Sequence, residues 1–150
     1  MASRRKEIIE FITTQLKEID GQTSGFDASY TYVNNLFNNV YRKLKFLDEV
    51  NDFPALYISA GTEIRDFNSK NLTLATLDAT IRAYVFGEDN SQDLSDSLVQ
   101  DIEHVIYSLG DNPDKGILDI TIDNISTDEG LATPYGIAEV ELTIVYRLDG

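Results

Sequence analysis

Cysteine is absent from this 150-residue chain, and histidine occurs once, as His104. Without cysteine there is no disulfide, no thiol nucleophile and no thiolate metal ligand. A single histidine makes a zinc site or a histidine-based catalytic triad a poor hypothesis. The helical spacing around His104 places it with Gln100, Asp101 and Ser108 opposite the apolar stripe, so we expect this imidazole to be solvent-exposed and without a role.

Long apolar runs and nucleotide-binding motifs are also missing. No stretch approaches the roughly 20 apolar residues that cross a bilayer, and the N-terminus lacks a signal-peptide core, so we expect no membrane segment and no targeting. No GxGxxG, GxxxxGK or HExxH pattern occurs. Residues 111–114 offer oxygen ligands for calcium but lack the full spacing of an EF-hand loop, which favours a plain turn. We therefore expect no enzyme, no metal and no cofactor.

Positive charge is scarce in the C-terminal part of the chain. The 12 basic and 26 acidic residues give a net charge of −14. Residues 1–85 carry 10 basic and 11 acidic side chains, whereas residues 86–150 carry 2 and 15. A surface this acidic repels phosphate backbones at short range, which argues against ordinary nucleic-acid binding. Solubility alone is an equally good explanation of the charge.

The longest strand pattern spans residues 72–86. Its second half alternates strictly, and the residues expected to face the core are Leu77, Ala79, Ile81, Ala83 and Val85. Leu72 and Leu74 have the opposite parity, which predicts either a bulge near residues 75 and 76 or a separate first segment. Further strands are expected over residues 29–33, 40–44, 55–61, 117–126 and 137–147, with a helical turn over residues 46–51 and a polar loop over residues 62–71.

Two amphipathic helices are expected, over residues 3–20 and from Asn90 or Ser91 to Leu109. The second has one continuous apolar stripe, made of Leu94, Leu98, Ile102, Val105, Ile106 and Leu109. Strands with one apolar face and helices with one apolar stripe pack as layers. The sequence thus predicts an α+β fold, a mainly antiparallel β-sheet with two α-helices packed on one face, as a single domain over residues 1–150.

Alternation in the last two strands gives each a polar, acidic outer face. In residues 117–126, Leu118, Ile120 and Ile122 are expected to face inward, and in residues 137–147 every second residue from 138 to 146 is. The outward acids are Asp119, Asp123, Glu139 and Glu141. Paired carboxylates can act as general acid and base, but acids two or four residues apart on a strand usually only face solvent.

The order of elements and several phrases resemble the tail terminator proteins of long-tailed bacteriophages. Besides the N-terminal helix, the resembling segments are VYRKLKFLDEVNDFPALYISAGTEI, TIRAYVFGEDNSQDLSDSLVQDIEHVI and STDEGLATPYGIAEVELTIVYR. The resemblance implies a virion protein, assembled in the host cytoplasm, that forms a ring of six copies on the last ring of the tail-tube protein. Such a ring stops tube growth, offers a surface to the neck of the filled head and lets genome DNA pass through its opening.

Candidate contact residues follow from exposure and composition once this resemblance is adopted. Contact with the tail tube is assigned to the expected loop at residues 65–70, with Arg65, Asp66, Phe67 and Lys70. Contact between subunits is assigned to the loop at residues 128–135, with Asp128, Glu129 and Tyr135. The acidic lining of the DNA passage is assigned to Asp119, Asp123, Glu139 and Glu141, because carboxylates let DNA slide without sticking.

Two alternatives remain open from the residues alone. The first is a different phage neck component, such as a head-completion or tail-completion protein, which would share the ring habit and bind the other side. The second is an enzyme or small-ligand protein on an α/β scaffold, which the missing site chemistry disfavours.

Overall fold

The computed structural model describes residues 4–69, 72–109 and 116–148. The elements in chain order are α1 (Arg4–Leu16), β1 (Val40–Tyr41), the 3₁₀ helix η1 (Leu47–Glu49), β2 (Ala55–Ser69), β3 (Leu72–Phe86), α2 (Ser91–Leu109), β4 (Ile117–Thr127) and β5 (Tyr135–Arg147). The strands form one sheet in the order β1-β2-β3-β5-β4. All pairings are antiparallel except that of the short β1 with β2. The predicted α+β fold is confirmed.

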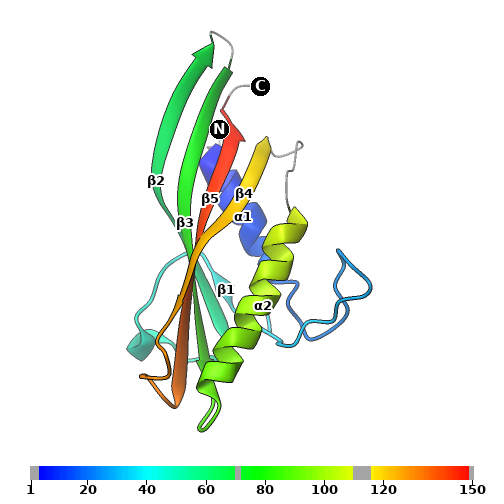
Figure 1. The fold of residues 1–150 in the computed structure, drawn as a ribbon, viewed down its shortest axis with the longest axis vertical. Helices are drawn as coiled ribbons and strands as arrows, with labels where there is room; N and C mark the ends of the chain where they lie inside the picture. The colour runs from blue at the N-terminus through cyan, green and yellow to red at the C-terminus, as the bar shows by residue number, and fades with distance from the viewer. Residues whose placement is uncertain (1–3, 70–71, 110–115, 149–150) are drawn as a thin grey trace.

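Both helices pack against one face of the sheet, and the main core lies between these two layers (Figure 1). The expected inward residues of β3 and β5 are buried, and so is the stripe of α2 except for the half-buried Leu94. A second, smaller cluster lies on the opposite face, where residues 47–54 cover one end of the sheet. Its buried members are Val50, Ala55, Tyr57 and Tyr84. We refer to the rest of that face as the helix-free face.

The polar loop predicted over residues 62–71 is wrong, because β2 continues to Ser69 and pairs with β3 along its length. Figure 1 shows the β2–β3 hairpin extending along the long axis beyond the ends of β4 and β5. The polar side chains suit this strand because they bond to each other. Tyr146 donates a hydrogen bond to Glu63, and Arg65 Nε lies 2.9 Å from Glu63 Oε2. Side-chain pairing here outweighs the low strand propensity of charged residues.

Neither of the two explanations predicted for the parity of Leu72 and Leu74 is correct. The strand β3 is continuous from Leu72 to Phe86, and the bulge belongs to its neighbour. Ala60 pairs with Ala79, and Glu63 pairs with Leu77, so β2 carries the extra residue. The pairing of β3 with β5 runs without a break from Leu74 to Phe86. Leu74 is half-buried on the helix-free face, which explains its parity without any bulge.

Several boundaries also differ from expectation. The α1 helix ends at Leu16, before the predicted residue 20, because Glu18 and Ile19 bond three residues back and tighten the last turn. Residues 29–33 form a single bridge, Thr23 to Thr31, in place of a strand, and the strand at residues 40–44 shrinks to Val40–Tyr41. The predicted helical turn is confirmed as η1.

Along β4, a register shift between Ile117 and Asp119 buries Ile117 and leaves Leu118 exposed, contrary to expectation, while Ile120 is buried as predicted. Ser3, the first residue of the predicted N-terminal helix, and the turn predicted at residues 111–114 lie outside the described residues.

Candidate functional site

The four acids predicted to share an outer face do share the helix-free face of the sheet. Asp119 pairs with Val145, and Thr143 donates a hydrogen bond to Asp123, so both acids lie on the side away from the helices. Glu139 and Glu141 alternate with buried neighbours on β5. All four carboxylates therefore lie on the same face of the two C-terminal strands.

One member of this face was missed and another is neutralised. Asp78 on β3 lines, with Asp123 and Glu141, a hollow of about 360 Å³; its parity with Thr80 and Arg82 in the strand could have placed it there. Arg82 Nε donates to Glu139 Oε1 at 2.7 Å, so Glu139 is part of an ion pair. The negative charge is therefore concentrated at Asp78, Asp123 and Glu141, with Asp119 beyond them.

Three of the four predicted tail-tube contact residues, Arg65, Asp66 and Phe67, lie on the projecting hairpin. Arg65 pairs with the buried Ala75 and so lies on the helix side, whereas Asp66 pairs with Leu74 on the helix-free side. Phe67 pairs with Thr73 in the backbone register, and Lys70 lies outside the described residues. Burial raises and hydrogen bonds lower the pKa of Glu63. The bonds from Tyr146 and Arg65, with the charges of Arg65 and Arg5, outweigh the burial, so its pKa lies below the usual value.

The conformation of the turn at residues 128–134 is fixed by hydrogen bonds and ring contacts within this chain. Asp128 accepts hydrogen bonds from the backbone N–H groups of Ala132, at 2.8 Å, and Ile137, at 3.1 Å. Tyr135 packs against aromatic neighbours, with ring centroids 5.3 Å from Phe86 and 5.4 Å from Phe53. Of the three predicted contact residues, only Glu129 is exposed to solvent.

The most exposed large apolar residue on this turn was missed: the side chain of Leu131 is 87% exposed. Its position between Gly130 and Ala132, in an otherwise polar turn, is the sequence signal that could have found it.

A buried carboxylate on α2 contradicts the polar face predicted for that helix. Asp101 is 0% exposed. It accepts hydrogen bonds from the Tyr30 hydroxyl at 2.7 Å, from the backbone N–H of Val33 at 3.1 Å, and from the backbone N–H and side-chain amide of Asn34 at 2.9 and 3.0 Å. Burial, reinforced by this carboxylate, raises the pKa of the Tyr30 phenol. Asp101 thus fixes the irregular segment between α1 and β1 onto α2.

His104, expected to be exposed and without a role, belongs to the same attachment. Its ring stacks on Tyr30 with centroids 4.0 Å apart, and its Nε2 lies 2.7 Å from Ser24 Oγ. The helical pattern could not show this, because the partners come from a segment about 80 residues earlier in the chain.

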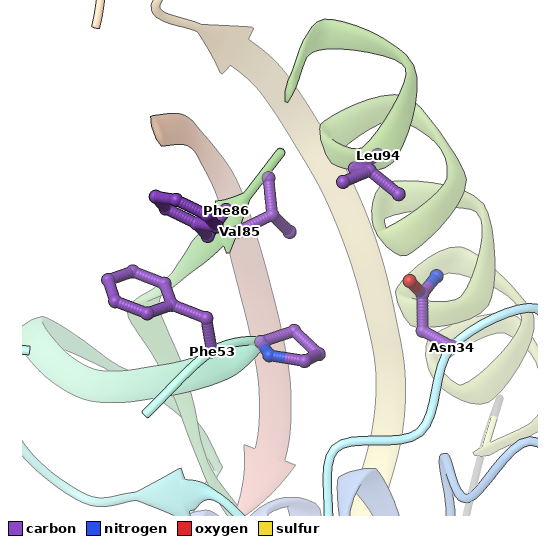
Figure 2. Close-up of a pocket in the computed structure, with 6 residues that line it drawn as sticks. Asn34, Phe53, Val85, Phe86 and Leu94 are labelled. Carbon is purple, nitrogen blue, oxygen red and sulfur yellow. The ribbon is translucent and has the colours of Figure 1, made fainter. Parts of the chain in front are cut away.

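Beside this attachment lies an apolar cleft of about 400 Å³ (Figure 2). It lies between α2, the start of β2, the end of β3 and the segment between α1 and β1 that Asp101 fixes onto α2. Its lining residues are Asn34, Phe53, Pro54, Val85, Phe86 and Leu94. Asn34 is held by its bonds to Asp101, so the network fixes one wall of the cleft. Apolar walls with one amide suit an aliphatic or aromatic side chain.

Among the described residues, no group of three or more His, Cys, Asp and Glu side chains is arranged to hold a metal ion. The described helices include none that is long and apolar enough to span a membrane.

The fold is shared with a virion protein. A chain in the structure titled "Virion of native gene transfer agent (GTA) particle" superposes with a TM-score of 0.50 at 14% identity, over 93% of this chain and 92% of the other. At that identity the likeness concerns the fold alone. The class defined at this point is a small α+β protein with an acidic sheet face and a projecting hairpin.

Sequence comparison gives the family. The family described as "Bacteriophage Tail Tube Terminator Protein" matches residues 2–149. The "Tail tube terminator protein p142" of Escherichia phage T5 is 32% identical over an alignment of 127 residues, and the match covers 77% of this chain and 79% of that protein. The chain therefore belongs to the bacteriophage tail tube terminator family, whose members are structural proteins of the phage tail, as the resemblance implied.

Proposed function

We propose that this chain forms a ring, six copies in this family, that caps the completed tail tube, stops its polymerisation and offers the surface to which the head and neck attach. The observation that carries the proposal is the family match over residues 2–149. The whole chain acts as one structural domain without catalysis or cofactor. It acts in the virion, at the head-proximal end of the tail, after assembly in the host cytoplasm.

The acidic helix-free face supports a place for DNA in this ring. Carboxylates repel a phosphate backbone at short range, and the effect is strongest where several carboxylates converge. Asp78, Asp123 and Glu141 converge on one hollow of that face. With this face toward the opening, the ring passes DNA without binding it, and the helices lie on the outside.

The projecting β2–β3 hairpin supports a place for the tail tube. Among the described residues, β1 pairs with β2 at Leu56 and Tyr57 only, so the part of β2 toward the hairpin tip has one edge without a partner strand there. An unpaired edge offers backbone donors and acceptors to a partner strand. The hairpin is thus the element that contacts the tail-tube protein, with Arg65 and Asp66 on its two faces.

The direct test is capping in vitro. Purified tail-tube protein is allowed to polymerise with and without this protein, and tube lengths are measured by electron microscopy. We expect the protein to stop elongation. A label attached to this protein should be seen at one end of each tube only. Elongation that continues at the same rate, with label absent from tube ends, contradicts the proposal and favours the alternative of a neck or completion protein that acts elsewhere.

A further inference from the structure

We propose that the end of the sheet opposite the hairpin tip binds a basic protein, the head or neck component that joins the capped tail. This end is formed by residues 46–54, 86–93 and 127–135, and we call it the loop end (Figure 1). The inference rests on the proposed function, in which the hairpin contacts the tail tube. It names the surface that remains for the head or neck and the chemistry of the partner.

The three segments of the loop end form one surface. Each contributes one aromatic ring to a shared cluster. In it, the ring centroids of Phe53 and Phe86 lie 6.2 Å apart, and the centroid of Tyr135 lies 5.4 and 5.3 Å from them. The backbone N–H of Gly87 also donates a hydrogen bond to the carbonyl of Pro134 at 2.8 Å. Because these contacts fix the segments to one another, a partner that binds across them orders little new structure.

The loop end carries only negative charge. Its segments hold three, three and two acidic residues and no lysine, arginine or histidine, which gives −8 of the net charge of −14. All of these acids are exposed except the half-buried Asp128. Among the described residues, no ion pair involves an acid of the loop end. Of the basic residues just before residue 46, Arg42 pairs with Glu10, and Lys45 lies over the Tyr57 ring, 5.9 Å from its centroid.

Apolar surface lies among these acids. Besides the cleft of about 400 Å³, a hollow of about 530 Å³ lies at this end and is lined by Leu47, Asp48, Val50 and Tyr135. The side chains of Leu131 and Phe46 are 87% and 73% exposed. The acids alone would serve solubility, but exposed apolar side chains do not. Apolar hollows with a charged rim are typical of surfaces that bind proteins.

The charge of the loop end selects the partner. Phosphate backbones are repelled, so this end does not hold DNA. The loop end of a second copy is repelled for the same reason, and in the proposed ring the hairpins of all copies face the tube. A protein surface with lysine and arginine around apolar side chains is attracted, binds faster and fills the hollows. The component that meets the ring on its head-proximal side is in position to present such a surface.

Joining of capped tubes to heads tests the inference. Tubes of purified tail-tube protein are capped with this protein or a variant and mixed at low salt with DNA-filled heads from the phage in which this gene is disrupted. Electron microscopy measures tube length and the rate at which heads join. Asp52→Lys with Glu88→Lys reverses two exposed charges of the loop end. Glu7→Lys with Asp96→Lys, at exposed positions on α1 and α2, makes the same change in net charge and is the matched control.

The loop-end double variant should cap tubes as the wild type does but join heads at least about tenfold more slowly at low salt. The control should match the wild type in both. Wild-type joining should also slow as salt is raised, because salt screens exposed charges. Leu131→Ser changes no charge and should slow joining by about tenfold, because it removes an apolar side chain that the partner covers. This variant decides the matter if the double variant does not fold.

The outcomes separate this inference from the proposed function. If the folded loop-end variant joins heads at the wild-type rate, or if the control slows as much, the inference is wrong while termination stands. If the loop-end variant no longer caps tubes, or no longer assembles as the wild type does in sedimentation, this end binds the tube protein or a second copy and the inference is overturned. If the wild-type protein leaves tube length unchanged, the proposed function itself is refuted.

Discussion

Asp101 is the residue on which the placement of the segment between α1 and β1 depends most. A buried carboxylate that loses its acceptor capacity leaves donors unsatisfied, at a cost of about 1–3 kcal/mol each. In Asp101→Asn, the new amide N–H₂ group is itself a donor. It faces N–H or O–H groups whose hydrogen bonds a carboxylate oxygen accepted before. We expect unfolding free energy to fall by about 2–3 kcal/mol in urea titration. Asp96→Asn, at an exposed site on the same helix, should change it by less than about 0.5 kcal/mol. Equal stabilities of the two variants would contradict the role of Asp101.

The lowered pKa of Glu63 predicts how the stability of the folded protein depends on pH. Its pKa is lowered in the folded protein, so its contribution is present above the ordinary pKa of a glutamate and is lost as pH falls through the folded value. Glu63→Gln should therefore cost stability at neutral pH and flatten the acid limb of the curve of melting temperature against pH. Melting scans between pH 3 and pH 7, about the range in which carboxylates titrate, measure this; parallel acid limbs for variant and wild type would count against it.

The sequence could not reveal either of these residues. Helical spacing places Asp101 opposite the apolar stripe, and only the folding of a segment about 70 residues earlier over that face buries it. Glu63 reads as one acid in a polar loop, because its partner Tyr146 comes from the last strand. Periodicity describes the neighbours of a residue along its own element, whereas burial of a charge depends on partners far away in the chain.

At the scale of elements, Gly136 sets how closely α2 approaches the sheet. A Cβ there would lie 2.3 Å from Ser95 Oγ, 2.6 Å from Val85 Cγ2 and 2.7 Å from the carbonyl oxygen of Ser91. Gly136→Ala must therefore push α2 away from β5, and we expect a loss of about 1–3 kcal/mol in unfolding free energy. Gly61→Ala is the control, since its nearest contact would be an ordinary 3.6 Å. Similar stability of both variants would show that α2 adjusts freely.

The β2–β3 hairpin makes a functional prediction. Asp66→Lys changes an exposed residue on the helix-free side of the arm and should leave melting temperature unchanged. If the hairpin contacts the tail tube, the variant should cap tubes at least tenfold less well, which corresponds to about 1.4 kcal/mol of binding free energy. Asp96→Lys on α2 makes the same charge change away from the hairpin. Equal loss of capping by both variants would place the contact elsewhere.

The elements show where alternation along the sequence predicts well and where it does not. In β3, β5 and α2 the apolar residues recur at the period of the element, and the residues expected to face the core are buried there, apart from the half-buried Leu94. In the outer part of β2, charged residues replace the apolar ones, because the strand edge is stabilised by ion pairs and hydrogen bonds in place of core burial. A strand held in this way has the composition of a loop.

At the scale of the whole molecule, the acidic face predicts how DNA moves. Asp119→Lys with Glu141→Lys places two cations on the helix-free face at exposed positions. If this face lines the passage, virions carrying the variant should have tails of normal length but should release DNA more slowly, and more so at low salt. Release from purified particles measures the rate. A rate equal to that of the wild type at low salt would mean that the face lies away from DNA.

Some properties of the whole molecule could be predicted from the sequence, and others could not. Net charge and its placement are properties of composition, so the acidic C-terminal face could be anticipated, and the order of elements carried the resemblance to the family. The apolar cleft could not, because its walls come from the segment before β1 and from β2, β3 and α2, and no local pattern joins them.

If this protein terminates the tail tube, the length of the tubes in an infected cell depends on it. Electron microscopy of lysates from cells producing the phage with this gene disrupted tests this dependence most directly, with the wild-type gene supplied separately as the control. We expect tubes of uncontrolled, excessive length with no heads attached, and normal tails when the gene is supplied. Tails of normal length that fail only to join heads would contradict termination and indicate a neck protein, and normal infectious particles would contradict both roles.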